Sequence, residues 1–218
     1  MSLILQRFKE LPVMGILRGI NEEQLLSLSE VIVSSGLKTL EITMNTPHAP
    51  ALISKLIQVA GKDLNIGAGT VLNRSDLMSA LESGAQFIVS PSVDEDVIEY
   101  CQMHSVPVFP GALTPTEIHK AWQAGAAMVK VFPASLFGPE YFKEIKGPFN
   151  NIELMAVGGV SRDSLASYFQ MGASAVAFGS GIFRREYLQN AEFKLIEDEI
   201  SQLIGSYREW LNMSHNNS

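Results

Sequence analysis

A glycine that closes a helix and leads directly into a strand occurs four times along the chain. The four segments are SSGLKTLEI, ESGAQFIVS, QAGAAMVKV and QMGASAVAF, and their glycines are Gly36, Gly84, Gly125 and Gly172. Glycine at this position adopts the left-handed conformation that ends a helix and redirects the chain. The near-constant spacing predicts a βαβα unit that is repeated four times, which amounts to eight strands and eight helices.

Short apolar runs rich in β-branched residues carry this repeat along the chain. They lack the alternation of a half-solvated antiparallel sheet, so we expect parallel strands that are covered on both faces. Eight such units in about 200 residues predict an α/β fold with a single (β/α)₈ TIM barrel, and a doubly wound open sheet is the alternative. The predicted strands are Val13–Leu17, Thr39–Thr43, Asn65–Ala68, Gln86–Val89, Val106–Phe109, Met128–Phe132, Glu153–Val157 and Ala175–Phe178.

The chain is expected to form one domain. It has 218 residues, of which 46% are apolar and 18% are charged, as in ordinary globular proteins. Because no Pro- or Ser-rich linker divides it, residues 1–218 are predicted to form a single domain with the barrel at about 12–190. An additional helix is expected at each end, over Ser2–Glu10 and over about 191–211.

Composition excludes several classes of function. A formal net charge of −7 argues against nucleic-acid binding, which needs clustered basic residues. No apolar stretch approaches the roughly 20 residues of a membrane span, and the N-terminus does not resemble a signal peptide. Cys101 is the single cysteine, so no internal disulfide framework is possible, and the four histidines lack metal-ligand spacing. We therefore expect a cytoplasmic protein without a metal or other cofactor.

A lone lysine near the end of the sixth predicted strand is the most informative candidate. In a (β/α)₈ barrel, function lies at the carboxyl ends of the strands. Strand alternation places Met128, Lys130 and Phe132 on the inner face, and it directs Val129 and Val131 to the helices. Burial lowers the pKa of a lysine and makes a neutral amine available, as Schiff-base formation with a carbonyl substrate requires. A lysine that extends to solvent or pairs with a core carboxylate is the alternative.

A glutamate in the second predicted strand is the natural partner of this lysine. Alternation sends Leu40 and Ile42 toward the helices and Glu41 into the barrel. A carboxylate there can accept and return protons during carbinolamine formation and C–C cleavage. A structural ion pair of Glu41 with Lys130 or Arg18 is the alternative.

Two glycine-rich loops are candidates for an anion site. Gly158 and Gly159 follow the seventh predicted strand, and Gly179-Ser180-Gly181 follow the eighth. Loops at these places often bind phosphate through backbone N–H groups in this fold, and glycine lets the backbone approach the oxygens closely. Ordinary turn glycines are the alternative.

Motifs in the same order as in a known family run from about Pro12 to Phe183. At these motifs the sequence resembles the 2-keto-3-deoxy-6-phosphogluconate (KDPG) aldolases, a family that includes the 4-hydroxy-2-oxoglutarate (KHG) aldolases and the related 6-phosphogalactonate (KDPGal) enzymes. The matching segments are ILRG, LEITMNTP, IGAGTVLN, FIVSPS, FPGALTPTE, VKVFPAS, GPEYFKEIKGPF, VGGV and FGSGIF.

The resemblance implies a metal-independent class I aldolase that is a homotrimer of (β/α)₈ barrels. Its substrate would be a phosphorylated 2-keto-3-deoxy sugar acid, cleaved to pyruvate and glyceraldehyde 3-phosphate, and bifunctional members also cleave 4-hydroxy-2-oxoglutarate. The family's Schiff-base lysine falls on Lys130 and its general acid/base falls on Glu41. Arg18 is our own candidate for the substrate carboxylate, together with Thr70. The other substrate-binding positions fall on Pro91, Phe132, Gly158, Gly159, Gly179 and Ser180.

Two positions depart from the gluconate-type pattern and leave the epimer open. Asn45 stands where some members have arginine, and Val157 stands where many gluconate-type members have threonine; galactonate-type members resemble this sequence at both. Two other classes of function share the barrel and the phosphate loops. One is a phosphosugar isomerase or epimerase, which needs no Schiff base, and the other is a non-catalytic phosphosugar sensor.

Overall fold

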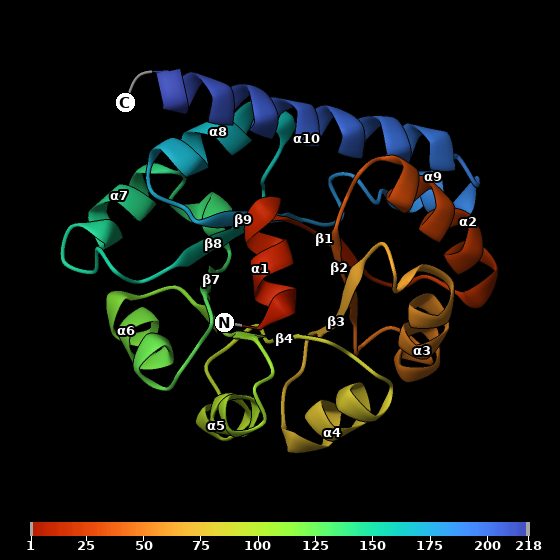
Figure 1. The fold of residues 1–218 in the computed structure, drawn as a ribbon, viewed down its shortest axis with the longest axis horizontal. Helices are drawn as coiled ribbons and strands as arrows, with labels where there is room; N and C mark the ends of the chain where they lie inside the picture. Colours follow the sequence, from red (N-terminus) through yellow and green to blue (C-terminus); the bar gives the residue numbers. More distant parts are fainter. Residues whose placement is uncertain (1, 217–218) are drawn as a thin grey trace.

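The computed structural model describes residues 2–216, which form a parallel barrel surrounded by helices (Figure 1). The strands lie in one sheet in the order β5-β4-β3-β2-β1-β9-β8-β7-β6, and every pairing between them is parallel. The strands are β1 Val13–Leu17, β2 Thr39–Thr43, β3 Asn65–Gly69, β4 Ile88–Val89, β5 Val108–Phe109, β6 Gly111–Ala112, β7 Val129–Val131, β8 Leu154–Val157 and β9 Ala175–Phe178.

A helix follows each strand position, as predicted, and the prediction of a (β/α)₈ barrel is confirmed. The helices are α1 Leu3–Glu10, α2 Glu22–Ser34, α3 Ala49–Ala60, α4 Arg74–Glu82, α5 Glu95–Met103, α6 Pro115–Gln123, the 3₁₀ turn η1 Ala134–Leu136, α7 Glu140–Lys146, α8 Arg162–Gln170, α9 Arg185–Gln189 and α10 Phe193–Asn216. Several helices begin at a residue whose side chain caps the first turn. For example, Thr114 and Glu117 form a reciprocal capping box at the start of α6.

The two ends of the sheet meet in one short segment of chain, which closes the barrel. β5 and β6 are separated only by Pro110, which has no N–H to donate to a ladder. On one side the Ser90 N–H donates to the Phe109 carbonyl at 3.3 Å, and on the other the Lys130 N–H donates to the Pro110 carbonyl at 2.9 Å. The nine strand segments of the described residues therefore occupy the eight strand positions of the predicted barrel.

Several predicted bounds were too wide or too narrow. β4, β5 and β7 are shorter than the predicted runs Gln86–Val89, Val106–Phe109 and Met128–Phe132, because the ladder extends only where both neighbouring strands are extended. α10 continues beyond the predicted end near residue 211 to Asn216, since no glycine or proline interrupts it there.

The apolar residues form two layers, one between the sheet and the helices and one inside the barrel. The inner layer includes Phe8 of α1, whose ring centroid lies 5.6 Å from that of Phe109. The Asn65 side-chain amide also donates to the Ile4 carbonyl of α1 at 3.3 Å. In Figure 1, α1 lies across the middle of the barrel. It fills the amino end, so the opening of the barrel lies at the carboxyl ends of the strands.

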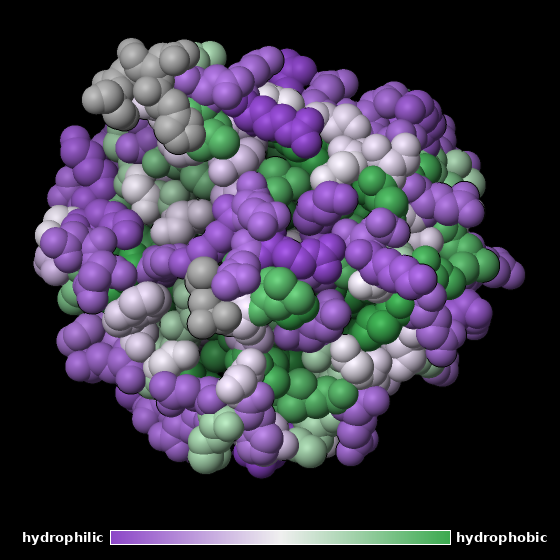
Figure 2. All heavy atoms as spheres, viewed as in Figure 1, coloured by the Kyte–Doolittle hydropathy of each residue, from purple (hydrophilic) through white to green (hydrophobic). Residues whose placement is uncertain are grey.

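The long helix α10 packs along α2 and α8 on the outside of the barrel (Figure 1). Its buried residues Ile196, Ile200, Leu203 and Tyr207 recur every three to four positions and form an apolar stripe. On the face that carries α1, hydrophilic residues are interleaved with hydrophobic ones (Figure 2). Within residues 2–216, no helix combines the length and the apolar character that crossing a membrane would require.

Candidate active site

Strand β7 directs Lys130 into the barrel, as the alternation predicted. Val129 and Val131 are buried in the outer layer against the helices, and Met128 belongs to the inner layer. The Lys130 side chain follows Met128 on the inner face, nearer the open end, and the residue is 7% exposed. Its Nζ atom lies 4.9 Å from the centroid of the Phe132 ring, within the range of a cation–π contact.

Strand β2 directs Glu41 into the same interior. Leu40 and Ile42 lie in the outer layer, and Glu41 is 1% exposed. The Oε2 atom of Glu41 is buried without a hydrogen-bond partner. The ion pairs of the described residues do not include one between Glu41 and Lys130. A buried carboxyl group that is neither hydrogen-bonded nor paired is costly to keep for structure alone, which argues against the purely structural role.

Burial raises the pKa of Glu41 and lowers the pKa of Lys130, and the opposite charges of the two groups only partly offset these shifts. Loss of solvation on burial raises the pKa of Glu41 to about 7, although the positive charges of Lys130 and Arg18 pull it down. Burial lowers the pKa of Lys130; the Glu41 carboxylate opposes this shift, and Arg18 adds to it. Near pH 7 the Glu41 carboxyl group can therefore both give and take a proton, and the lowered pKa of Lys130 makes its neutral amine more accessible.

Glycines on the neighbouring strand β3 make room for these side chains. A Cβ atom at Gly69 would overlap the carboxyl group of Glu41, and a Cβ atom at Gly67 would overlap the Phe87 ring. Gly67 and Gly69 thus leave space on the inner face of β3 for the Phe87 ring and the Glu41 carboxyl group.

We expect Gly69→Ala to lower turnover by about 10²-fold, because the added methyl group must displace the Glu41 carboxyl group from its position. The control is Gly205→Ala in α10, at a glycine whose Cβ would have nothing within 4 Å and whose φ lies outside the left-handed region. Steady-state kinetics of both variants, with thermal unfolding to verify the fold, would test this. Equal rates for Gly69→Ala and the wild type would contradict this role of Gly69.

Arg18 and Thr70 meet at the open end, after β1 and β3. The Arg18 Nη2 atom donates to Thr70 Oγ1 at 3.4 Å, and Arg18 is exposed to solvent. Thr70 has φ +56°, a left-handed conformation that is costly for a β-branched residue and is typical of functional sites. Pro91 follows β4 and lies against Gly111, where a Cβ would overlap the Pro91 carbonyl. These residues come together around the same opening.

The two predicted anion loops lie side by side, because β8 and β9 are paired parallel neighbours. Gly158 and Gly159 have φ values of +98° and +76°, which glycine adopts without strain. Gly179 is half-buried and Ser180 is exposed, after the end of β9. The loops thus combine positive-φ glycines with exposed backbone, as an anion site requires.

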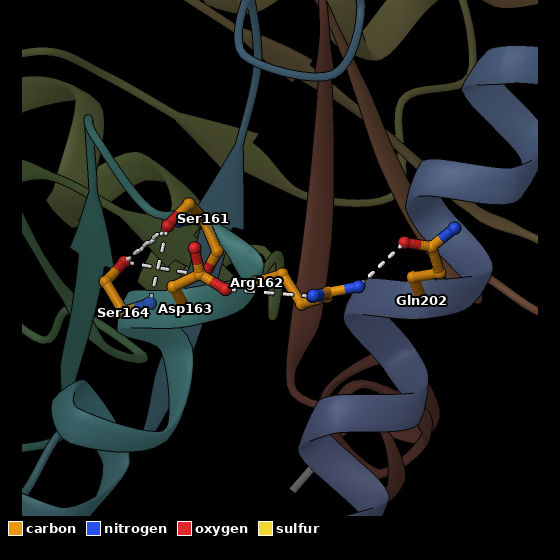
Figure 3. A network of polar contacts seen from close by, with 5 residues as sticks. All are labelled: Ser161, Arg162, Asp163, Ser164 and Gln202. Atoms are coloured by element: carbon orange, nitrogen blue, oxygen red, sulfur yellow. Dashed lines mark hydrogen bonds and ion pairs between the residues drawn. The ribbon is translucent and has the colours of Figure 1, made fainter.

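The helix that follows the first of these loops is firmly anchored (Figure 3). Ser161 caps α8: its Oγ accepts from the Ser164 N–H at 3.3 Å, and the Ser161 N–H donates to Ser164 Oγ at 3.0 Å. Arg162 reaches α10, where its Nη1 donates to Gln202 Oε1 at 3.0 Å. Figure 3 shows Arg162 extending from α8 toward Gln202 on the long helix. These bonds fix the amino end of α8 relative to the loop at Gly158 and Gly159.

Comparison with known proteins assigns the family. The family model described as "Aldolase: KDPG and KHG aldolase" matches residues 4–199. The chain belongs to this aldolase family. Aldolases are carbon–carbon lyases, so the predicted enzyme class is confirmed.

Relatives within the KDPG and KHG aldolase family include proteins named for either epimer. The chain is 35% identical to the 2-dehydro-3-deoxy-6-phosphogalactonate aldolase of Escherichia coli strain K12, over 80% of this chain and 86% of that one. It superposes on a native KDPGal structure with a TM-score of 0.87 and 31% identity, covering 93% and 97% of the two chains. A KDPG aldolase from Legionella pneumophila, solved with pyruvate captured as a covalent carbinolamine, gives a TM-score of 0.83 at 26% identity, covering 93% and 98%.

Three further residues of this family member lie beside the candidate site, and their contacts there were not predicted. Gly69 leaves room for Glu41, as described above. Ser135 packs against Gly159. A Cβ atom added to Gly159 would lie only 2.6 Å from the Cβ atom of Ser135. Thr46 is buried and bonded to the loop after β1. The inward-facing strand position of Gly69 could have been recognised from the sequence, whereas the contacts of Ser135 and Thr46 depend on loop conformation.

The described residues contain no group of three or more His, Cys, Asp or Glu side chains placed to hold a metal.

Proposed function

We propose that the protein is a class I aldolase that cleaves 2-dehydro-3-deoxy-6-phosphogluconate to pyruvate and glyceraldehyde 3-phosphate. The observation that carries the proposal is the buried Lys130 amine, with its lowered pKa, beside the unpartnered Glu41 carboxyl group at the open end of the barrel. A neutral buried amine is the nucleophile that an imine-forming enzyme needs.

The residues support the following cycle. Lys130 Nζ attacks the C2 carbonyl carbon, and the resulting carbinolamine loses water to give an iminium ion. Glu41 takes the proton of the C4 hydroxyl, the C3–C4 bond breaks, and its electron pair moves into the iminium to form an enamine. The aldehyde leaves. Glu41 then returns the proton to C3 of the enamine, and water hydrolyses the imine to release pyruvate and the free Lys130 amine.

The other site residues hold the substrate in register with the two catalytic groups. Arg18 and Thr70 bind the substrate carboxylate at one side of the opening, since they already share a hydrogen bond there. Pro91 and Phe132 form walls beside the reacting carbons. The phosphate lies on the backbone of Gly158, Gly159, Gly179 and Ser180, across the opening. Fixing both ends of the substrate decides which carbonyl meets the lysine.

The epimeric 6-phosphogalactonate substrate is the alternative. It is favoured by Asn45 and Val157 and by the 35% identity to a relative named for that substrate. Turnover of both 6-phospho sugar acids under the same conditions distinguishes the two. The same assay with 4-hydroxy-2-oxoglutarate tests cleavage to pyruvate and glyoxylate.

Trapping with borohydride tests the covalent mechanism directly. The full chain is incubated with pyruvate and borohydride, and its intact mass and peptide map are measured. We expect one reduced pyruvyl group, located on Lys130. If no adduct formed on a folded protein, the isomerase or epimerase and the non-catalytic sensor would be the remaining readings. Neither an isomerase or epimerase nor a sensor would be modified by borohydride in the presence of substrate. The two differ in that a sensor binds the substrate and releases no product.

The same proposal extends to assembly and location. We propose that residues 1–218 form one domain and that the protein is a cytoplasmic homotrimer that needs no cofactor. The segment after β7 exposes Leu136 and Phe137, and neighbouring exposed apolar side chains of this kind are typical of a contact surface. Light scattering is expected to give three times the 23.8 kDa mass of the chain.

A further inference from the structure

A buried pair of hydroxyl groups links the loop after β1 to the loop after β2. Thr43 at the end of β2 is 0% exposed, and Thr46 is 3% exposed. Their Oγ1 atoms lie 3.0 Å apart, and the Gly19 N–H donates to Thr46 Oγ1, also at 3.0 Å. Thr46 therefore provides the acceptor for a backbone group in the loop after β1.

Main-chain hydrogen bonds hold Thr46 itself in place. Its N–H donates to the Thr43 carbonyl at 2.9 Å, and its carbonyl accepts from the Ala49 N–H at 3.1 Å at the start of α3. Between Thr43 and Thr46 in the sequence, the Met44 N–H donates to the Gly69 carbonyl of β3 at 2.7 Å. The turn after β2 is thus fixed to β3, and its hydroxyl group is a defined anchor for the loop after β1.

Arg18 is the residue of that loop whose placement matters for the site. It is exposed, and its side chain has a hydrogen bond only at its tip, where Nη2 donates to Thr70 Oγ1 at 3.4 Å. The next residue, Gly19, has φ +68°, so the chain turns sharply directly after Arg18. The bond from Gly19 to Thr46 fixes this turn and hence the point from which the long Arg18 side chain extends.

We propose that Thr46 is a positioning residue for Arg18. Its hydroxyl group holds the loop after β1 so that the Arg18 guanidinium stays beside Thr70, ready for the substrate carboxylate. Thr46 contacts no substrate and acts through the Gly19 N–H. The inference rests on the proposed function, because the carboxylate-binding role of Arg18 belongs to it.

The test measures the pyruvate concentration that gives half-maximal borohydride trapping on Lys130. Thr46→Val keeps the shape of the side chain and removes the acceptor. We expect the half-saturating concentration to rise about three- to tenfold, as for loss of one hydrogen bond, while the maximal trapping rate stays within about twofold. Thr46→Ser restores the hydroxyl group and is expected to lie within about twofold of the wild type.

Two variants keep the test independent of folding. Thr43→Val removes the other hydroxyl group of the pair but leaves the Gly19–Thr46 bond, so its half-saturating concentration should stay near the wild-type value. Thr46→Ala removes the acceptor with less crowding and must behave like Thr46→Val. Thermal unfolding of each variant identifies the ones that are folded. An unchanged half-saturating concentration in a folded Thr46→Val or Thr46→Ala protein overturns the proposal.

A double-mutant cycle shows whether Thr46 acts through Arg18. In the Arg18→Met background, adding Thr46→Val should change the half-saturating concentration by less than about twofold. Full additivity would mean that Thr46 acts by another route, and the positioning proposal would be wrong although Arg18 still binds the carboxylate. If Arg18→Met alone changes nothing, the proposed role of Arg18 fails, and the positioning role fails with it.

Discussion

Lys130→Met is expected to lower turnover by about four to six orders of magnitude and to abolish trapping by pyruvate and borohydride. Methionine is unbranched like lysine, is one atom shorter and has no amine, so neither the carbinolamine nor the iminium can form. The fold should persist, since replacing a 7% exposed ammonium group with an apolar group removes a desolvation cost. We expect a thermal midpoint equal to that of the wild type or higher.

Lys130→Arg is the matched control for charge. It retains a positive charge at the same strand position, but the guanidinium remains protonated and is no nucleophile. The expected turnover is as low as that of Lys130→Met. Substantial turnover by either variant would exclude a Schiff base on Lys130 and would favour the isomerase or epimerase reading.

Glu41→Gln is expected to slow turnover by about 10²- to 10⁴-fold, the usual contribution of a general acid/base. Glutamine is isosteric with glutamate and accepts no proton, so C–C cleavage and enamine protonation both lose their catalyst. Pyruvate should still be trapped on Lys130, because the amine remains. A rate close to that of the wild type would place the acid/base role on another group.

The pH dependence gives a second readout of Glu41. Its pKa is raised from 4.5 to about 7, so the carboxylate that removes the C4 proton forms as pH rises through about 7 rather than through 4.5. Wild-type turnover of the bound sugar acid should therefore increase across that range. In Glu41→Gln this ascending limb should disappear. If it persisted, the titrating group would be a different one.

The placement of the two proposed catalytic residues was predictable because it depends on local patterns alone. Lys130 and Glu41 are single charges within apolar strands, and a period of two decides which face each occupies. The barrel followed from the repeat of glycine-terminated helices. The interruption at Pro110 was harder to foresee, since strand length in a parallel sheet depends on both neighbours.

Contacts between loops could not be predicted in the same way. The bond from the Gly19 N–H to Thr46 and the contact of Arg18 with Thr70 join segments 27 and 52 residues apart. No periodicity encodes such distances, because they depend on how the loops after three strands settle against each other. Gly69 lies between these cases: its inward position could be read from the sequence, but the overlap with Glu41 required the fold.

The helix that fills the amino end of the barrel has a kinetic consequence. With Phe8 seated among the inner apolar residues, reactants enter and leave through the carboxyl end. In the proposed cycle, the pyruvyl group is bonded to Lys130, while the phosphate-bearing fragment is held by the loops after β8 and β9. The aldehyde must therefore depart first and pyruvate last. In the condensation direction, pyruvate must bind first, which is a compulsory order that product-inhibition patterns would reveal.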